Sequence, residues 1–178
     1  IYLEEHPDTK IHVIDSLSAG GEVDLIVRKL NHLVAEGLDF DQVVDGITAY
    51  QAKTKLLFVL AKVDNLVKNG RLSKLIGTVV GLLNIRMVGE ASKTGTLELL
   101  QKARGQKKAI KAAFDELLKA GYVGGHITIA HRNNDKFIEQ FSELVREKFA
   151  QASIEVLPTS GLCSFYAEEG GLLMGYEI

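Results

Sequence analysis

Five apolar residues follow one another without a break at Leu56–Leu60, and lysines stand on either side of them at Lys55 and Lys62. The run is far shorter than the ~20 apolar residues that a membrane-spanning helix needs. It also lacks the alternation of a strand with one face in water, so it predicts a strand covered on both faces. Such a strand among segments of helical periodicity indicates an α/β layer architecture.

The segments before this run are typical of a strand, a loop and two helices. Residues 11–16 are short, β-branched and apolar, which predicts a strand, and small residues fill 18–21. Apolar residues recur at helical spacing from Val23 to Val34, and Asp39 can cap a second helix. We therefore expect one strand followed by two helices, as in a parallel layer flanked by helices.

The pattern changes near residues 62–70 from long helices to short strands and hairpins. The elements expected after this point are a short helix at 63–69, an apolar helix at 74–83, hairpin strands at 87–91 and 96–100, a helix after Gly105, a strand at 126–130, a helix from Asn133 or Asn134, and a last strand pair at 154–157 and 172–176. We therefore predict an α/β fold in two parts. Residues 1–65 would be the C-terminal part of an incomplete first domain with a parallel sheet, and residues 66–178 a second α/β domain.

Charge and composition exclude several classes of function. Twenty-one Lys and Arg against 23 Asp and Glu give a net charge of −2, which argues against broad electrostatic affinity for nucleic acid or an anionic membrane. No apolar run approaches the ~20 residues that span a bilayer, so no stable membrane insertion is expected. One cysteine excludes an internal disulfide and suits a reducing compartment, so we expect a cytoplasmic protein. The five histidines do not stand at metal-ligand spacing, so no metal is expected. The chain begins at Ile1 rather than Met, and we expect a fragment.

The loop at residues 15–21 lies where the expected strand ends and a helix begins. In α/β sheets ligands bind at this place, and helix N-termini attract anions. The loop has neither the glycine pattern of a dinucleotide site nor a Walker lysine. Ser16 and Ser18 are candidate ligand contacts, whereas the simpler interpretation makes Ser18 a helix cap and the glycines a tight turn.

Two arginines beside glycines are candidate anion-binding residues. Arg71 follows Gly70 on a short loop, which suits bidentate recognition of a carboxylate or phosphate. Arg104 precedes Gly105 within a basic cluster whose lysines we interpret as a solvated surface. The adjacent carboxylates at 168–169 are more simply a solvated turn, so no catalytic residue is assigned.

Short motifs in a fixed order carry a resemblance to a known family. They are Val13-Ile14-Asp15-Ser16, Asn69-Gly70-Arg71-Leu72, Thr94-Gly95-Thr96-Leu97 leading to Lys102-Ala103-Arg104, and Ile129-Ala130-His131. Together they resemble the DegV family over nearly the whole chain. The resemblance implies a long-chain fatty acid bound between two α/β domains and presented to a fatty acid kinase subunit, with the protein as carrier of the acyl chain or acyl phosphate. It implies no enzyme activity and no cofactor, and we expect a monomer.

The chain departs from the family pattern at two places. The Thr-Ser and Leu-Ser-Gly-Thr segments, which grip the fatty acid carboxylate in the family, would precede Ile1. The family's His-x-Gly-Pro-Gly segment corresponds to residues 166–170, Tyr-Ala-Glu-Glu-Gly. Tyr166 can donate a hydrogen bond but carries no imidazolium charge. The resemblance thus assigns Arg71, Arg104 and Tyr166 to the lipid head group or a phosphate.

A glycine-spaced apolar segment at 75–83 can line a tunnel for the acyl chain. Its glycines lower helix propensity, and they leave gaps beside apolar bulk. The candidate tunnel residues are Ile76, Val79, Val80 and Leu83. Close helix packing without a ligand is an equal alternative. For the function, a small-molecule enzyme acting on a phosphorylated or carboxylate substrate is the alternative, and a protein-interaction domain is a third.

Overall fold

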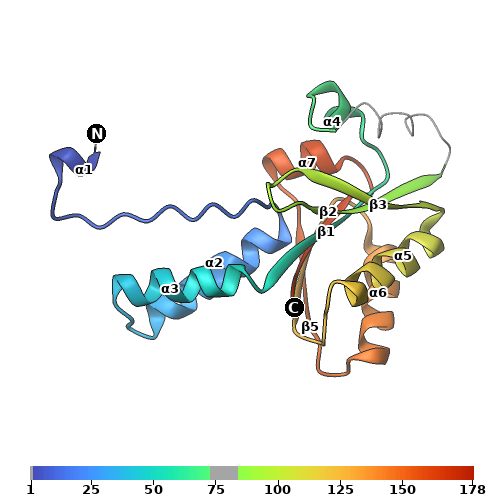
Figure 1. The fold of residues 1–178 in the computed structure, drawn as a ribbon. Helices are drawn as coiled ribbons and strands as arrows, with labels where there is room; N and C mark the ends of the chain where they lie inside the picture. The colour runs from blue at the N-terminus through green and yellow to red at the C-terminus, as the bar shows by residue number, and fades with distance from the viewer. Residues whose placement is uncertain (1, 73–83) are drawn as a thin grey trace.

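The computed structural model describes residues 2–72 and 84–178, which form seven helices and six strands (Figure 1). The helices are α1 (Tyr2–Glu5), α2 (Gly21–Ala35), α3 (Phe40–Gln51), α4 (Asp64–Lys68), α5 (Gln106–Lys119), α6 (Asp135–Lys148) and α7 (Gly161–Ala167). The strands are β1 (Thr54–Leu60), β2 (Ile85–Ala91), β3 (Leu97–Arg104), β4 (His126–His131), β5 (Ser153–Pro158) and β6 (Leu172–Glu177). The predicted α/β class is confirmed.

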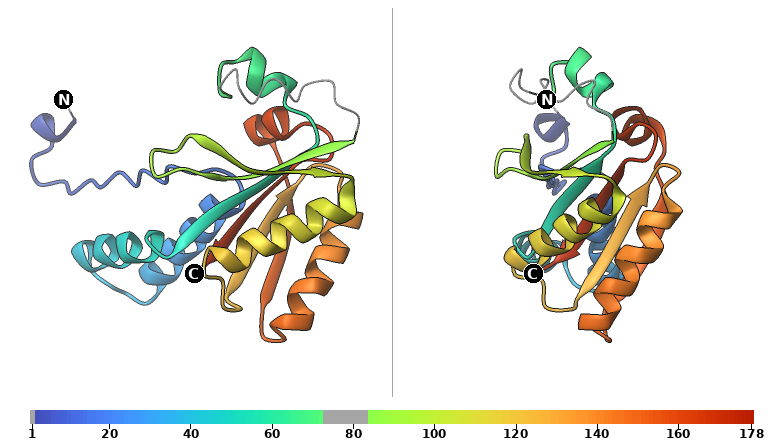
Figure 2. Two further views of the ribbon diagram at one scale, coloured as in Figure 1. Left: turned by 45° about the vertical axis from the view of Figure 1, so that its right-hand side comes forward. Right: turned by 90° about the vertical axis from the view of Figure 1, so that its right-hand side faces the viewer.

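The six strands form one twisted sheet in the order β3-β2-β1-β6-β4-β5 (Figure 2). β1 pairs antiparallel with β2 and β6, β6 pairs antiparallel with β4, and β4 and β5 are parallel. The apolar run at 56–60 is therefore a central strand with partners on both edges. The strands expected at 154–157 and 172–176 both form, but β4 lies between them.

The predicted division between residues 65 and 66 falls within this sheet. A division between residues 65 and 66 would separate β1 from its neighbours, yet Phe58 lies opposite Gly89 on one side and Leu173 on the other. The cause is that an apolar central strand needs hydrogen-bonding partners at both edges, and the later strands supply them. Among the described residues up to 65, β1 is the one strand, and it belongs to the same sheet as the later strands; the division into two domains stays a prediction.

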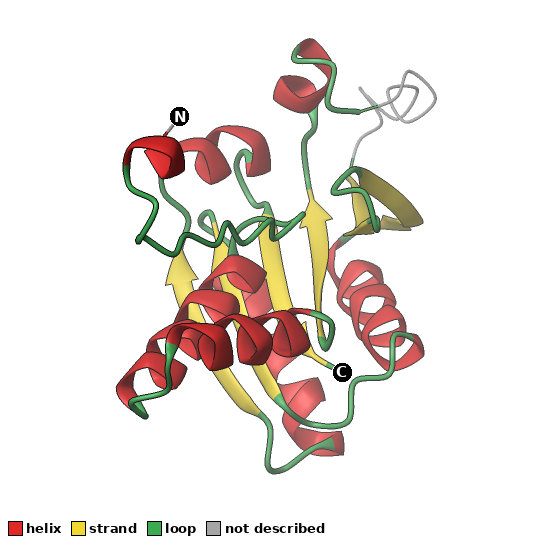
Figure 3. Ribbon diagram, turned by 60° about the vertical axis from the view of Figure 1, so that its left-hand side comes forward, coloured by secondary structure: helices red, strands yellow, loops and turns green. Residues whose placement is uncertain are grey.

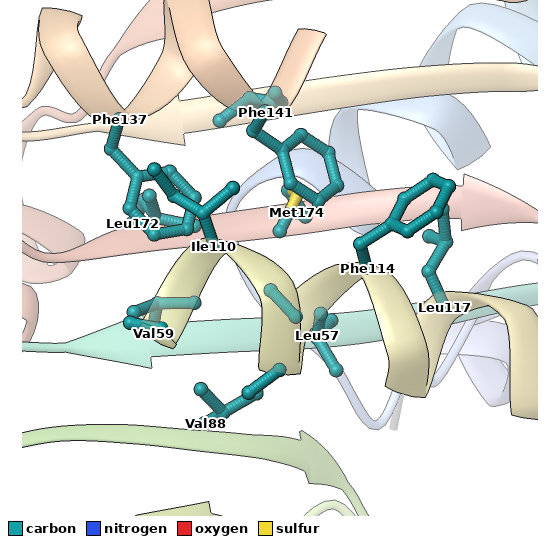
Figure 4. Packing of buried hydrophobic residues seen from close by; sticks show 14 of the residues in the cluster. Leu57, Val59, Val88, Ile110, Phe114, Leu117, Phe137, Phe141, Leu172 and Met174 are labelled. Atoms are coloured by element: carbon teal, nitrogen blue, oxygen red, sulfur yellow. The ribbon is translucent and has the colours of Figure 1, made fainter. Parts of the chain in front are cut away.

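Helices α5 and α6 cover one face of the sheet and enclose the main core (Figure 4). Alternate strand residues such as Leu57, Val59 and Met174 point to this face. They meet Leu117 of α5 and Phe141 of α6, both fully buried. The part of this face beneath α5 and α6 is thus filled by apolar side chains.

Helices α2 and α3 lie across the opposite face (Figure 3), and the start of α2 touches the sheet directly. A Cβ atom on Gly21 would lie 2.1 Å from the carbonyl oxygen of Thr128, and one on Gly175 would lie 2.2 Å from the amide nitrogen of Glu22. The two backbones therefore approach each other closely, which only glycine permits. Asp39 begins α3 with the predicted cap, because its side chain accepts from the N–H of Gln42 at 2.9 Å.

The strand predicted at residues 11–16 does not form. This segment is irregular and lies along α3, to which Gln51 Nε2 ties it by donating to the carbonyl oxygen of Asp15 at 2.6 Å. Ile14 packs against the α2–α3 pair, whereas Val13 is 81% exposed. The β-branched, apolar sequence favours a strand, but a strand needs a partner, and no described segment supplies one.

Candidate functional site

The second face of the sheet, opposite α5 and α6, carries an apolar surface beyond the end of α2. Leu56, Phe58 and Leu60 alternate along β1 on this face, and Met87 and Leu173 continue it on the neighbouring strands. Apolar residues of the β2–β3 hairpin extend the surface outward and are only partly buried; they are Ile85, Ala91, Leu97 and Leu99. This partly open apolar surface has the chemistry to contact hydrocarbon.

Helices α4 and α7 close one end of the second face. The N–H of Asn65 donates to Glu168 Oε1 at 2.9 Å, and Asn65 Nδ2 donates to the carbonyl oxygen of Phe165 at 2.8 Å. Leu66 of α4 and Ala167 of α7 are buried in the same apolar cluster. Polar contacts thus fix the two short helices to each other, and their buried side chains belong to the apolar cluster of the second face.

Arg71 and Tyr166 meet at this end of the second face. Arg71 Nε donates to Tyr166 Oη at 2.9 Å, and the guanidinium carbon lies 5.1 Å from the centre of the tyrosine ring. Arg71 is held by the end of α4, where Gly70 takes a φ of 66° and the N–H of Arg71 donates to the carbonyl oxygen of Leu66 at 2.9 Å. The structure therefore brings together two of the three residues expected at the head group, although their roles stay predictions.

Arg104, the third of these residues, lies at the end of β3. Its neighbour Ala103 is buried in the core against α5, so strand alternation turns Arg104 to the second face. The register places it opposite Ile85 at the rim of the apolar surface, and its side chain is exposed. Arg104 also borders a cavity of about 1180 Å³ formed with residues of α5 and α6. No contact joins Arg104 to Arg71 among the described residues, so a cleft shared by the two stays a prediction.

Ser16 borders a cavity of about 640 Å³ between the loop at 15–21, the start of β1 and the β2–β3 turn, whereas Ser18 does not line it. Ser18 Oγ donates to Glu22, whose other carboxylate oxygen accepts from Thr54 Oγ1 at 2.8 Å. A carboxylate or phosphate brought to Ser18 would lie beside the Glu22 carboxylate, which disfavours the contact by charge repulsion. Contact of Ser16 and Ser18 with a head group stays a prediction.

The buried Glu22 is a polar residue of this region that the sequence did not single out. It lies in the first turn of α2, where a carboxylate is favoured by the helix dipole, and it is only 6% exposed. Its partners Ser18 and Thr54 are distant from one another in the sequence. Ser18 therefore does not cap the helix as the simpler interpretation proposed, because the capping residue is Gly20 and has no side chain to do so.

Two further expectations concern metals and the acyl tunnel. In the described ranges, no cluster of three or more His, Cys, Asp and Glu is arranged to hold a metal ion. None of the described helices combines the length and the apolar character needed to cross a bilayer. The candidate tunnel residues Ile76, Val79, Val80 and Leu83 lie outside the described residues.

Comparison with known proteins gives consistent matches over the whole chain. The family model of the DegV family of uncharacterised proteins matches residues 1–176. A DegV domain-containing protein of Streptococcus pneumoniae is 79% identical over 178 residues, which are 100% of this chain and 63% of that protein. The chain thus spans about 63% of the length of this relative.

Solved structures match equally well. The crystal structure of the fatty acid kinase (Fak) B3 protein of Streptococcus pneumoniae, loaded with linoleic acid, is 78% identical with a TM-score of 0.96, over 99% of this chain and 63% of that one. A DegV family protein of Eubacterium eligens loaded with heptadecanoic acid is 38% identical with a TM-score of 0.93, over 99% of this chain and 64% of that one. Both similar structures hold a long-chain fatty acid.

Proposed function

The chain belongs to the DegV family, and on that premise we propose that the protein containing it binds a long-chain fatty acid. The observation that carries the proposal is the match to the linoleic acid-loaded Streptococcus pneumoniae protein, which is 78% identical over 99% of this chain. The heptadecanoic acid-loaded relative supports the same ligand class. The second face of the sheet supplies a surface of the required chemistry.

The hydrocarbon would lie on the second face, beside the partly buried apolar residues of the β2–β3 hairpin. Each methylene removed from water contributes ~0.8 kcal/mol, so ten of them contribute about 8 kcal/mol. The carboxylate has to keep hydrogen bonds when it leaves water, or it costs several kcal/mol. Arg71 with Tyr166 at one end of the face, and Arg104 at its rim, are the polar groups we assign to the head group or to a phosphate on it.

A first domain would cover this surface from the side of α2 and α3. The segment at 11–16 supports this, because Ile14 packs against α2 and α3 while Ile11 and Val13 are 49% and 81% exposed. A segment with one apolar residue against helices and others exposed is typical of a strand in a helix-covered sheet. The part of the relatives that the chain does not span is long enough for a domain that would complete this layer.

The protein would act as a carrier and perform no chemistry of its own. We propose that it presents the acyl chain to a kinase subunit in the cytoplasm, as a monomer, and carries the acyl phosphate onward. The Fak B3 name of the similar Streptococcus pneumoniae protein supports a place in a fatty acid kinase system. In this proposal the arginines bind and orient the charged head group, and the apolar second face binds the acyl chain.

Calorimetric titration of oleate tests the proposal, with this chain and with a chain extended to the length of the relatives. We expect tight binding by the extended chain and weak or undetectable binding by this one, because the donors that the resemblance places upstream of Ile1 are absent. Equal affinities would refute the need for a first domain. No binding by either chain would refute the function.

Charge removal in the extended chain tests the head-group assignment. Arg71→Ala and Arg104→Ala should leave oleate binding largely intact and reduce phosphorylation of the bound fatty acid by the kinase. Arg146→Ala is the matched control, because Arg146 is an exposed arginine in the last turn of α6. Equal phosphorylation rates in all three variants would contradict the assignment.

A further inference from the structure

A polar cavity of about 480 Å³ lies at the end of the sheet where β1 and β4 end and α5 and α6 begin. Its volume is within the ~300–1,000 Å³ of ordinary ligand pockets. Three cationic side chains line it, Lys62 after β1, Arg86 in β2 and Lys136 in α6. The cavity is separate from the apolar second face, because the register pairs Arg86 with Ala103, which points to α5.

The charge free to act on a ligand in this cavity is positive. Within residues 2–72 and 84–178, Lys62, Arg86 and Lys136 have no hydrogen bond or ion pair, although Arg86 is half-buried. Two carboxylates also line the cavity, and both have partners of their own. Glu169 accepts from Asn133 Nδ2 at 3.2 Å and lies 3.7 Å from Arg132 Nε, and Asp135, whose side chain is 83% exposed, lies 3.9 Å from His131 Nε2.

Two helices also begin at the cavity with their first N–H groups free of side-chain caps. Gly105 precedes α5 and has no side chain to cap it. Asn134 precedes α6, but its Nδ2 donates to the carbonyl oxygen of Gly170 at 2.7 Å, and its side chain does not cap the helix. The partial positive charge of both helix ends adds to that of the three cations.

We propose that this cavity binds a phosphate group, either inorganic phosphate or the phosphoryl group of an ester or anhydride. A guanidinium binds two phosphate oxygens with parallel hydrogen bonds, and lysines neutralise the remaining charge. Apart from the small Ala61 and Gly170, the lining is polar, so it does not suit an acyl chain. The site lies on the side of the sheet that α5 and α6 cover, so it does not depend on fatty acid binding.

Titration of the 178-residue chain with inorganic phosphate, butyl phosphate and ADP tests the site, with binding followed by amide chemical shifts and by calorimetry. We expect the amides of Gln106, Asp135 and Lys136 to shift with at least one of the three. Arg86→Gln should weaken that binding roughly tenfold to a hundredfold, as the loss of charged hydrogen bonds implies. The probe that binds most tightly identifies the source of the phosphate group.

Two further variants keep the test decisive. Lys136→Gln changes an exposed residue, so it should fold normally and still weaken phosphate binding. Arg146→Gln removes the same charge at the far end of α6 and should leave the affinity unchanged. If no probe binds at millimolar concentration, or if Arg86→Gln and Arg146→Gln weaken binding equally, the site is refuted. Because lipid is absent from the assay, neither result bears on fatty acid binding.

Discussion

Tyr176→Phe is a single change that we expect to leave the protein as stable as before, or more stable. Tyr176 is fully buried in β6, and no described residue forms a hydrogen bond with its hydroxyl group. Its ring packs at 6.3 Å from the ring of Tyr122, in an edge-to-face arrangement. The substitution therefore keeps the aromatic packing and removes only the oxygen.

The expected size of the effect follows from the hydroxyl's lack of a partner. A buried polar group without a partner costs about 1–3 kcal/mol, so its removal should raise the free energy of unfolding by ~1 kcal/mol. For a chain of this length, 1 kcal/mol corresponds to roughly 2–4 °C in the melting temperature. Tyr122→Phe is the matched control, because the Tyr122 hydroxyl donates to the carbonyl oxygen of Gly125 at 2.8 Å.

The two variants should therefore change stability in opposite directions. Tyr122→Phe removes a satisfied hydrogen bond and should lower the free energy of unfolding by about 1 kcal/mol. Urea unfolding followed by circular dichroism measures both changes against the unsubstituted chain. A loss in Tyr176→Phe as large as that in Tyr122→Phe would refute the reasoning. It would show that the hydroxyl has a partner, such as water in the small cavity of about 190 Å³ that Tyr176 borders with Glu116.

Two more stability predictions follow from buried groups. Burial raises the pKa of Tyr122 to about 12 and raises that of Tyr176 above its usual range, whereas unfolded tyrosine ionises near pH ~10. Their contribution to the free energy of unfolding is complete below pH ~10 and is lost as pH rises through the native pKa values, so the urea midpoint should stay constant up to about pH 10 and fall between about pH 10 and pH 12; a constant midpoint over that range would contradict this. Gly175→Ala places a Cβ 2.2 Å from the amide nitrogen of Glu22 and should cost about 3 kcal/mol, while Gly46→Ala, which meets only the flexible side chain of Leu33, should cost far less in the same urea assay.

The elements that could be predicted from the sequence are those whose cause is local. Helical spacing and a capping aspartate before α3 indicated that helix, and the apolar run at 56–60 indicated a strand covered on both faces. The pairing of β1 could not be predicted, because its partners β2 and β6 lie far away in the chain. The strand predicted at 11–16 was wrong for the same reason, because a strand forms only where a neighbouring strand pairs with it.

In the candidate site, too, residues with a local sequence signal could be predicted, whereas contacts between distant residues could not. Gly70 and Gly105 marked Arg71 and Arg104, because glycine at a turn is a local signal. Contact between Arg71 and Tyr166 depends on how α4 and α7 pack, and no sequence pattern shows it. The cationic cavity was missed because Lys62, Arg86 and Lys136 are spread along the chain and converge only at the end of the folded sheet.

The backbone contact of α2 with β6 limits how the molecule can deform. Most helices rest on a sheet through side chains, which change rotamer and let the helix slide by fractions of an ångström. At Gly21 and Gly175 no side chains separate the two backbones, so a displacement of the start of α2 is passed on directly to β6. Any opening and closing around a ligand would therefore have its hinge outside this contact, with the start of α2 and the sheet moving as one body.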